Sequence, residues 1–173
     1  SAYKINAFTT DQFKLLNTNQ IQALNSSQVN ALSTSLLNVL GTSQFQAIAS
    51  NSIAAISSST LGAISSTQVN ALTNLQIQAL TTTQVNVLGD ALPGLSTAQL
   101  STLSATQLSG LSSSQFSGLF VSPKIGALSP INLTKISSTQ FSAITSTQIA
   151  LLSSAQIQVL SASIIKSLSS TQL

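Results

Sequence analysis

The sequence predicts an all-α solenoid, or superhelix, in which each eight-residue repeat forms one short capped helix. Three observations support this prediction. Leu, Ile or Phe recurs at every eighth position, a small polar residue usually follows it, and Gln usually stands three residues after that. Self-similarity at a fixed short period indicates a repeat architecture. A β-solenoid is the alternative, because segments such as residues 82–88 alternate polar and apolar residues.

The recurring apolar residue defines position one of each octad. It stands at 8, 16, 24, 32, 40, 48, 56, 64, 72, 80, 88, 95, 103, 111, 119, 128, 136, 144, 152, 160 and 168. One interval between these residues is seven residues long and another is nine. The two deviations cancel, so the later residues fall again at multiples of eight. We expect one repeat solenoid over residues 1–173, in which the irregular units 88–95 and 119–128 form bends or loops.

Positions two and five of the octad predict a helix start. In the unit at Ser65, the hydroxyl is expected to accept from the amide of Gln68, whose side chain reaches back to the Ser65 amide. This is a capping box, and Ile64 and Val69 flank it as a hydrophobic staple. Each octad therefore predicts a helix of about six or seven residues. The Gln column comprises Gln12, Gln20, Gln28, Gln44, Gln68, Gln76, Gln84, Gln99, Gln107, Gln115, Gln140, Gln148, Gln156 and Gln172.

The Gln column has a second interpretation, a ladder of amides that joins copies of the protein laterally. We favour the capping box, because it explains Gln and the preceding Ser or Thr together. Leu36 and Ile164 replace Gln in residues 33–40 and 161–168, and these two units should have weaker caps.

Prolines and glycines fit the helical prediction. Pro123 and Pro130 each follow a Ser, which places them at the first position of a helix, where a missing amide hydrogen costs nothing. Gly41 and Gly89 follow an anchoring Leu, where a left-handed helix end is expected. A strand interior accommodates Pro130 poorly, and only seven Gly are present for tight β-turns.

The composition provides few side chains that can act in catalysis or bind a metal ion. Charged residues make up 4% of the chain, against about 25% in a typical soluble domain. Without His, Cys, Glu or Arg, we predict no enzyme, no catalytic residues, no cofactor-binding residues and no metal site. Five scattered lysines do not form a nucleic-acid surface. No apolar run is long enough to span a membrane.

The polar surface residues allow several interpretations. Lys14 and Lys166 occupy position seven, which should face solvent. The Ser and Thr of positions three and four are expected to form a solubilising surface, with a hydroxyl array for ice or glycan as the alternative. Asn25 and Asn132 match the N-glycosylation pattern, as expected by chance in a chain rich in Asn, Ser and Thr.

The unit L-[ST]-x-x-Q-[IV]-x-A-L resembles octapeptide repeats of long bacterial secreted and surface proteins. The segments LTNLQIQALTTTQVNVL (residues 72–88) and ISSTQFSAITSTQIALL (residues 136–152) carry the resemblance. It implies an extracellular or cell-surface protein of adhesin-like or matrix-forming type, such as a biofilm component, built as an α-helical solenoid.

We therefore expect a structural protein, a self-assembling subunit of an extracellular filament, fibre or matrix, with itself as the head-to-tail or lateral partner. The chain begins and stops within a unit and shows no atypical end repeats, which monomeric solenoids usually have. The alternative is a stalk or binding segment of a large surface adhesin, with glycans or ice as partners. Scattered lysines disfavour a third interpretation, an amphipathic protein on a membrane surface.

Overall fold

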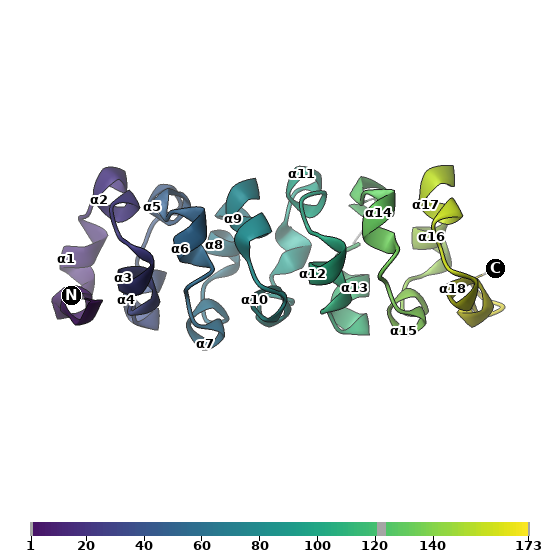
Figure 1. Ribbon diagram of the computed structural model, residues 1–173, viewed down its shortest axis with the longest axis horizontal. Helices are drawn as coiled ribbons and strands as arrows, with labels where there is room; N and C mark the ends of the chain where they lie inside the picture. Colours follow the sequence, from purple (N-terminus) through teal and green to yellow (C-terminus); the bar gives the residue numbers. More distant parts are fainter. Residues whose placement is uncertain (1, 121–123, 173) are drawn as a thin grey trace.

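The structure is a computed structural model that describes residues 2–120 and 124–172. All regular secondary structure in these residues is helical, and no strand occurs among them. The short helices follow one another along an elongated rod, with the N-terminus at one end and the C-terminus at the other (Figure 1). The predicted all-α solenoid is confirmed, and the β-solenoid alternative is wrong.

Three octads make one turn of the solenoid. Helices pack against the third element before and the third after them, as α2 does on α5 and α5 on α8, so the helices form three rows along the rod. Row one contains η1 (Ala2–Ala7), α3 (Ser26–Asn30), α6 (Ser50–Ile53), α9 (Asn74–Ala79), α11 (Thr97–Leu100), η3 (Lys124–Ala127) and α16 (Ser146–Ile149). Row two contains α1 (Thr10–Lys14), α4 (Thr34–Asn38), α7 (Ser58–Leu61), α10 (Thr82–Val87), α12 (Ala105–Ser109), α14 (Pro130–Leu133) and α17 (Ser154–Gln158). Row three contains α2 (Thr18–Gln22), α5 (Thr42–Ala47), α8 (Ser66–Ala71), η2 (Leu92–Gly94), α13 (Ser113–Gly118), α15 (Ser138–Phe141) and α18 (Ala162–Ser167).

The α-helices have four to six residues, so the longest, such as α9, reach the predicted length of about six and the others are shorter. The end of α9 shows what limits the length. A tight bond from the Leu80 amide to the Ile77 carbonyl (3.2 Å) closes the last turn. Leu80 itself is extended, with φ −62° and ψ 136°, and so is Thr81, with φ −71° and ψ 161°. Because the residue that anchors one helix also precedes the next N-cap, the chain turns there and the helix ends early.

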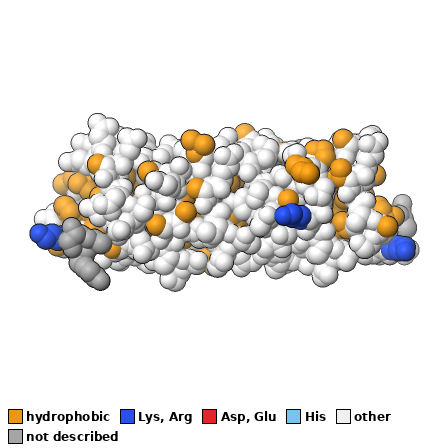
Figure 2. Space-filling view, viewed as in Figure 1, with side chains coloured by type: hydrophobic (Ala, Val, Ile, Leu, Met, Phe, Trp, Pro, Cys, Tyr) orange, Lys and Arg blue, Asp and Glu red, His pale blue; other side chains and the backbone are white. Residues whose placement is uncertain are grey.

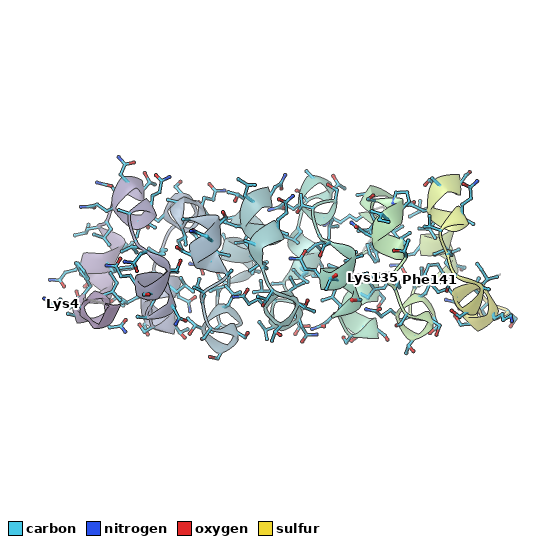
Figure 3. All side chains as sticks on the ribbon, viewed as in Figure 1. Lys4, Lys135 and Phe141 are labelled. Carbon is cyan, nitrogen blue, oxygen red and sulfur yellow. The ribbon has the colours of Figure 1, made fainter. Side chains whose placement is uncertain are left out.

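The core lies along the axis of the rod and is formed by position six of the octads. In the regular octads, the side chains at this position are at most 1% exposed from Phe13 to Phe141, which is labelled in Figure 3. They are Phe13, Ile21, Val29, Leu37, Phe45, Ile53, Leu61, Val69, Ile77, Val85, Leu100, Leu108, Phe116, Leu133 and Phe141. A helix of one turn is not stable alone in water, so this burial between coils is what holds the helices.

The irregular unit 88–95 is not a loop. Its residues Leu92–Gly94 form a 3₁₀-helix, η2, that takes a regular place in row three above α8. Leu92 is buried there. In the unit 119–128, Lys124–Ala127 form η3, and residues 121–123, with the predicted helix start at Pro123, lie outside the described residues. Pro130 is the first residue of α14, as predicted.

The predicted left-handed helix ends at Gly41 and Gly89 are wrong. Gly41 is the N-cap of α5, with φ −68° and ψ 165°, and Gly89 is not in the left-handed region. At Gly41 the chain is already extended and continues into α5, and Leu88 before Gly89 is in the right-handed helical region, with φ −84° and ψ −2°. Gly89 is instead a place of close approach, where a β-carbon would collide with the side chain of Gln115 in the next coil.

Candidate functional site: a glutamine ladder between coils

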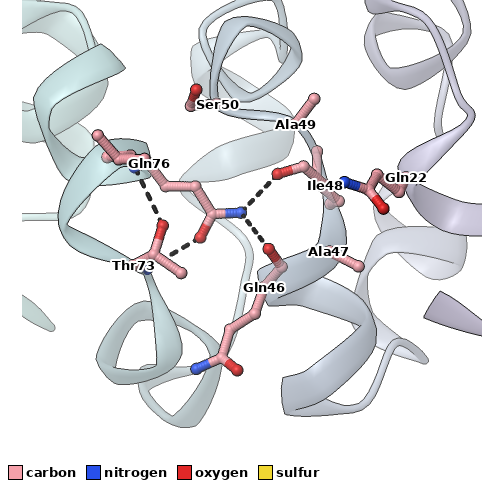
Figure 4. Close-up of a pocket in the computed structure, with 9 residues that line it drawn as sticks. Gln22, Gln46, Ala47, Ile48, Ala49, Ser50, Thr73 and Gln76 are labelled. Atoms are coloured by element: carbon pink, nitrogen blue, oxygen red, sulfur yellow. Dashed lines mark hydrogen bonds between the residues drawn. The ribbon is translucent and has the colours of Figure 1, made fainter. Parts of the chain in front are cut away.

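The predicted capping box is confirmed in most octads. In α9, the Thr73 hydroxyl accepts from the Gln76 amide at 3.2 Å, and the Thr73 amide donates to Gln76 Oε1 at 2.9 Å (Figure 4). The same reciprocal pair starts helices α1, α2, α3, α8, α10, α11, α12, α13, α15, α16 and α17.

The contact made by the side-chain nitrogen of Gln76 was not predicted from the sequence. Gln76 Nε2 donates to the carbonyls of Ile48 at 2.8 Å and Gln46 at 3.3 Å in the coil before (Figure 4). The Phe45 carbonyl of the same coil accepts from it at 3.0 Å. Gln76 is buried between the two coils. One amide group therefore starts its own helix with its oxygen and ties its coil to the preceding coil with its nitrogen.

This contact repeats along the rod as a ladder. In each case the Gln nitrogen lies between 2.6 and 3.0 Å from a carbonyl of the coil before, which belongs to the anchoring residue three octads earlier except at Phe120, the neighbour of the anchor Leu119. The donors and acceptors are Gln44 to Leu16, Gln68 to Leu40, Gln76 to Ile48, Gln84 to Ile56, Gln99 to Leu72, Gln107 to Leu80, Gln140 to Leu111, Gln148 to Phe120, Gln156 to Leu128 and Gln172 to Ile144. These amides join coils of one chain, so their use in lateral joining of copies is not supported.

The absence of Glu from the chain was the signal in the sequence that pointed to this ladder. A capping box accepts Glu as readily as Gln, because only a side-chain oxygen is required. The contact to the preceding coil requires an N–H donor, and a carboxylate has none. The sequence contains Gln throughout this column and no Glu.

Two other residues replace Gln in the ladder and keep the donor. Lys124 Nζ donates to the carbonyls of Pro93 at 2.6 Å and Leu95 at 2.8 Å. Asn132 is buried and its Nδ2 donates to the Leu103 carbonyl at 2.6 Å. The side chain at position five thus varies in length and charge, while its role as a donor to the coil before is kept.

The caps at Leu36 and Ile164 are weaker, as predicted. Each helix keeps only the bond from the amide of that residue to the preceding Ser hydroxyl, at 3.3 Å in both cases. At Leu36 the structure compensates, because Asn6 Oδ1 accepts from the Ser33 amide at 3.3 Å in place of the missing Gln oxygen. The side chain from the coil before thus completes this cap.

A second ladder runs in the opposite direction from position seven. Its side-chain amides donate to carbonyls at position eight of the coil that follows, with distances between 2.6 and 3.1 Å. The pairs are Asn6 to Ala31, Asn38 to Ala63, Gln46 to Ala71 and Asn86 to Gly110. Among the described residues, no buried side-chain nitrogen or oxygen lacks a hydrogen-bond partner.

The surface residues singled out from the sequence fall into two groups. Lys14 and Lys166 are exposed, as predicted. Asn25 caps α3 by accepting from the Gln28 amide at 3.0 Å, and Asn132 is buried in the ladder, so Asn132 is closed to glycosylation in the folded chain. Charged side chains are sparse on the face shown in Figure 2, and the few apolar ones are scattered.

Four pockets lined by described residues contain Lys4 and Asp90 as their charged groups and otherwise have neutral linings. One of about 440 Å³ lies over the junction of α5, α6 and α9, where Ala49 is small and Leu75 is exposed (Figure 4). In the described part of the chain, no three His, Cys, Asp or Glu residues gather to hold a metal ion. No helix there has the length and apolar character needed to cross a membrane.

The two ends of the rod differ in chemistry. In the first coil, Gln12 and Gln20 use their oxygens in capping boxes, and both side chains are exposed. In the last coil, Ile157 and Ile165 stand at position six of the octad but are 41% and 45% exposed, although the same position is at most 1% exposed in interior coils.

Two comparisons bear on the repeat. Residues 5–42, less than a quarter of the chain, match the sequence model of the ALTTAQ repeat family. A search of the curated proteins gave no match to the chain. The octad of the matched segment continues through the rest of the rod with the same capping pattern. The chain is therefore a repeat protein, similar over residues 5–42 to the ALTTAQ repeat proteins.

Proposed function

We propose that the chain is a structural protein, a self-assembling subunit of an extracellular filament, fibre or matrix. The observation that carries this proposal is the repetition of one coil contact along the rod, in which a position-five side chain donates to a backbone carbonyl of the coil before. A coil in a solenoid is stabilised by its neighbours on both sides, so the same kind of contact made between copies would add coil to coil. Repeated addition along one axis does not close and gives a filament.

The surface of the rod supports the same proposal. With seven charged residues in 173, repulsion between copies is weak. The resemblance to octapeptide repeats of secreted and surface proteins supports a location of this assembly outside the cell. No grouped acid–base or metal-binding side chains compete with a structural role in the described residues.

Electron microscopy of the purified 173-residue chain over a concentration series tests the proposal. Uniform filaments that lengthen with concentration are the expected result, and their helical repeat should match the three-octad coil. Dispersed short rods at every concentration would overturn the proposal and support the alternative, a stalk or binding segment of a larger surface protein.

A further inference from the structure

We propose that the rod has a preset opening point at the boundary between the coil of α3, α4 and α5 and the coil of α6, α7 and α8. The two parts of the rod separate there first and bend about the turn that links them, at Ile48 and Ala49. This inference goes beyond the proposed function and does not rest on it, because it concerns an interior boundary within one copy of the chain.

Two other interior boundaries have a complete ladder. The coil of α11, α12 and α13 is tied to the coil before it by Gln99, Gln107 and Gln115, which donate to backbone carbonyls at 2.7 to 2.9 Å. At the next boundary the donors are Lys124, Asn132 and Gln140, at 2.6 to 2.8 Å. All three rows of the rod are therefore tied at each of these two boundaries.

The opening point keeps this contact in row three alone. There Gln68 donates to two carbonyls of the coil before, at 2.9 and 3.0 Å. In rows one and two, position five is occupied by Ser52 and Thr60, whose side chains are shorter than Gln. The Ser52 hydroxyl lies 3.2 Å from the Ser26 hydroxyl, and the Thr60 hydroxyl accepts from Ser57 in its own octad at 2.8 Å. Neither reaches a backbone carbonyl of the coil before.

Two anchor carbonyls are left without donors as a result. They belong to Leu24 and Leu32, which stand three octads before the anchors of these two units. Neither carbonyl accepts a hydrogen bond within the described residues. Leu32 is only 3% exposed, so water has little access to its carbonyl while the boundary is closed. Opening would give this carbonyl water as a donor, which favours the open state.

The helices on one side of the opening point also start weakly. Ala49 is the N-cap of α6 and has no side-chain cap bond. In α7 the Ser57 hydroxyl accepts from the Thr60 amide at 3.1 Å, but the capping box is incomplete. Both helices have four residues, and helices this short depend on packing against their neighbours. The pocket of about 440 Å³ lies over the linking turn, with Ile48 and Ala49 in its lining.

Apolar packing holds the boundary closed at rest, since Ile53 and Leu61 are fully buried. The second ladder does not distinguish the boundaries, because Asn38 crosses this one as Asn86 crosses a complete one. The stability of a solenoid is roughly a sum of coil and boundary contributions, so the boundary with fewest hydrogen bonds opens most often. Two missing bonds should raise its open fraction by roughly 5- to 30-fold.

Native-state hydrogen exchange of the full chain, resolved by residue with NMR, measures opening at each coil. The amides of Ile53 and Leu61, which bond within the starts of α6 and α7, report on the opening point. The amides of Leu100 and Leu108 are the equivalent groups in α11 and α12, beside a complete boundary. Ile53 and Leu61 should exchange faster than Leu100 and Leu108 by roughly 5- to 30-fold.

Exchanging the position-five residues tests the cause. Thr60→Gln restores the residue of the regular octad and provides a donor for the Leu32 carbonyl, so the Leu61 amide should exchange about fivefold more slowly. Gln107→Thr creates the same gap at a complete boundary and should speed exchange of the Leu108 amide by a similar factor. Thr60→Glu is the matched control, because it provides an oxygen for the cap but no N–H donor, and it should not slow exchange.

Two results would overturn the opening point. One is equal exchange of Leu61 and Leu108 in the unmodified chain. The other is equal slowing by Thr60→Gln and Thr60→Glu, because the cap alone would then account for the effect. Far-UV circular dichroism establishes that each variant is folded under the exchange conditions. The measurement uses dispersed protein, so its result is independent of whether the chain forms filaments.

Discussion

The side-chain nitrogen of Gln76 donates to the backbone carbonyl of Ile48 at 2.8 Å across 28 residues of sequence. The oxygen of the same amide accepts from the Thr73 amide at 2.9 Å. Local helix capping and long-range packing thus depend on one functional group. This double use explains why the repeat retains an amide where a carboxylate would serve the cap equally well.

Gln76→Glu should lower the free energy of unfolding by about 3 kcal/mol at neutral pH, because three buried carbonyl contacts lose their donor and face a charge instead. Burial among carbonyls should raise the pKa of the introduced carboxyl. The protonated carboxyl regains one donor, so the stability deficit should shrink as pH falls through that raised pKa. Urea unfolding followed by far-UV circular dichroism at several pH values measures this.

Gln78→Glu is the control for the added charge, since Gln78 lies on the same helix and is exposed. It should change the unfolding free energy by less than about 0.5 kcal/mol. Equal losses in the Gln76 and Gln78 variants would show that the charge, and not the ladder, is responsible.

Lys124→Met should destabilise the rod by about 2 kcal/mol, because the carbonyls of Pro93 and Leu95 lose a charged donor. Lys124→Gln should be tolerated, since it restores the residue of the regular octad. Lys135→Met controls for loss of positive charge, because within the described residues the side chain of Lys135 makes one hydrogen bond, an exposed one of 3.5 Å to the Thr106 hydroxyl. Thermal unfolding compares the three variants, and equal behaviour of Met and Gln at Lys124 would contradict the assignment.

Gly110→Ala should destabilise by about 1–3 kcal/mol, because the added β-carbon collides with the Thr82 methyl group of the coil before. In a Thr82→Ser background the nearest side-chain carbon is 3.4 Å from that β-carbon. There the same change should become neutral or stabilising, since Gly110 has φ −79° and ψ −9°, which Ala adopts readily. A double-mutant cycle measured by urea unfolding checks the change of sign, and a loss that is equal in both backgrounds would rule out the collision.

Phe141→Ala should cost about 3–5 kcal/mol, because the side chain is fully buried on the axis of the rod. Phe141→Leu should cost less than about 1.5 kcal/mol, because Leu occupies the same position at Leu108 and Leu133. Differential scanning calorimetry distinguishes the two. Similar melting temperatures for both variants would mean that position six does not bear the packing assigned to it.

Much of each octad was predictable from the sequence because its signals are local. The Thr73 and Gln76 capping pair spans three residues, and the Pro130 helix start needs only its own ring geometry. The left-handed ends expected at Gly41 and Gly89 are wrong because Gly41 starts the next helix as an extended N-cap, and the turn from α10 to η2 needs no left-handed residue at Gly89. The loop expected at residues 88–95 failed because η2 is held by packing on α8.

The sequence by itself determined that short capped helices repeat every eight residues, because capping and burial of the apolar positions act within one octad. Only the tertiary structure decided that three octads complete a coil. The number of octads in a coil depends on the angle through which the chain turns between successive helices. Two successive extended residues, such as Leu80 and Thr81, make each of these turns, and three turns close the coil. Once the coil closes, Gln76 lies above Ile48, and the amide nitrogen that has no partner within its own octad finds one in the coil before.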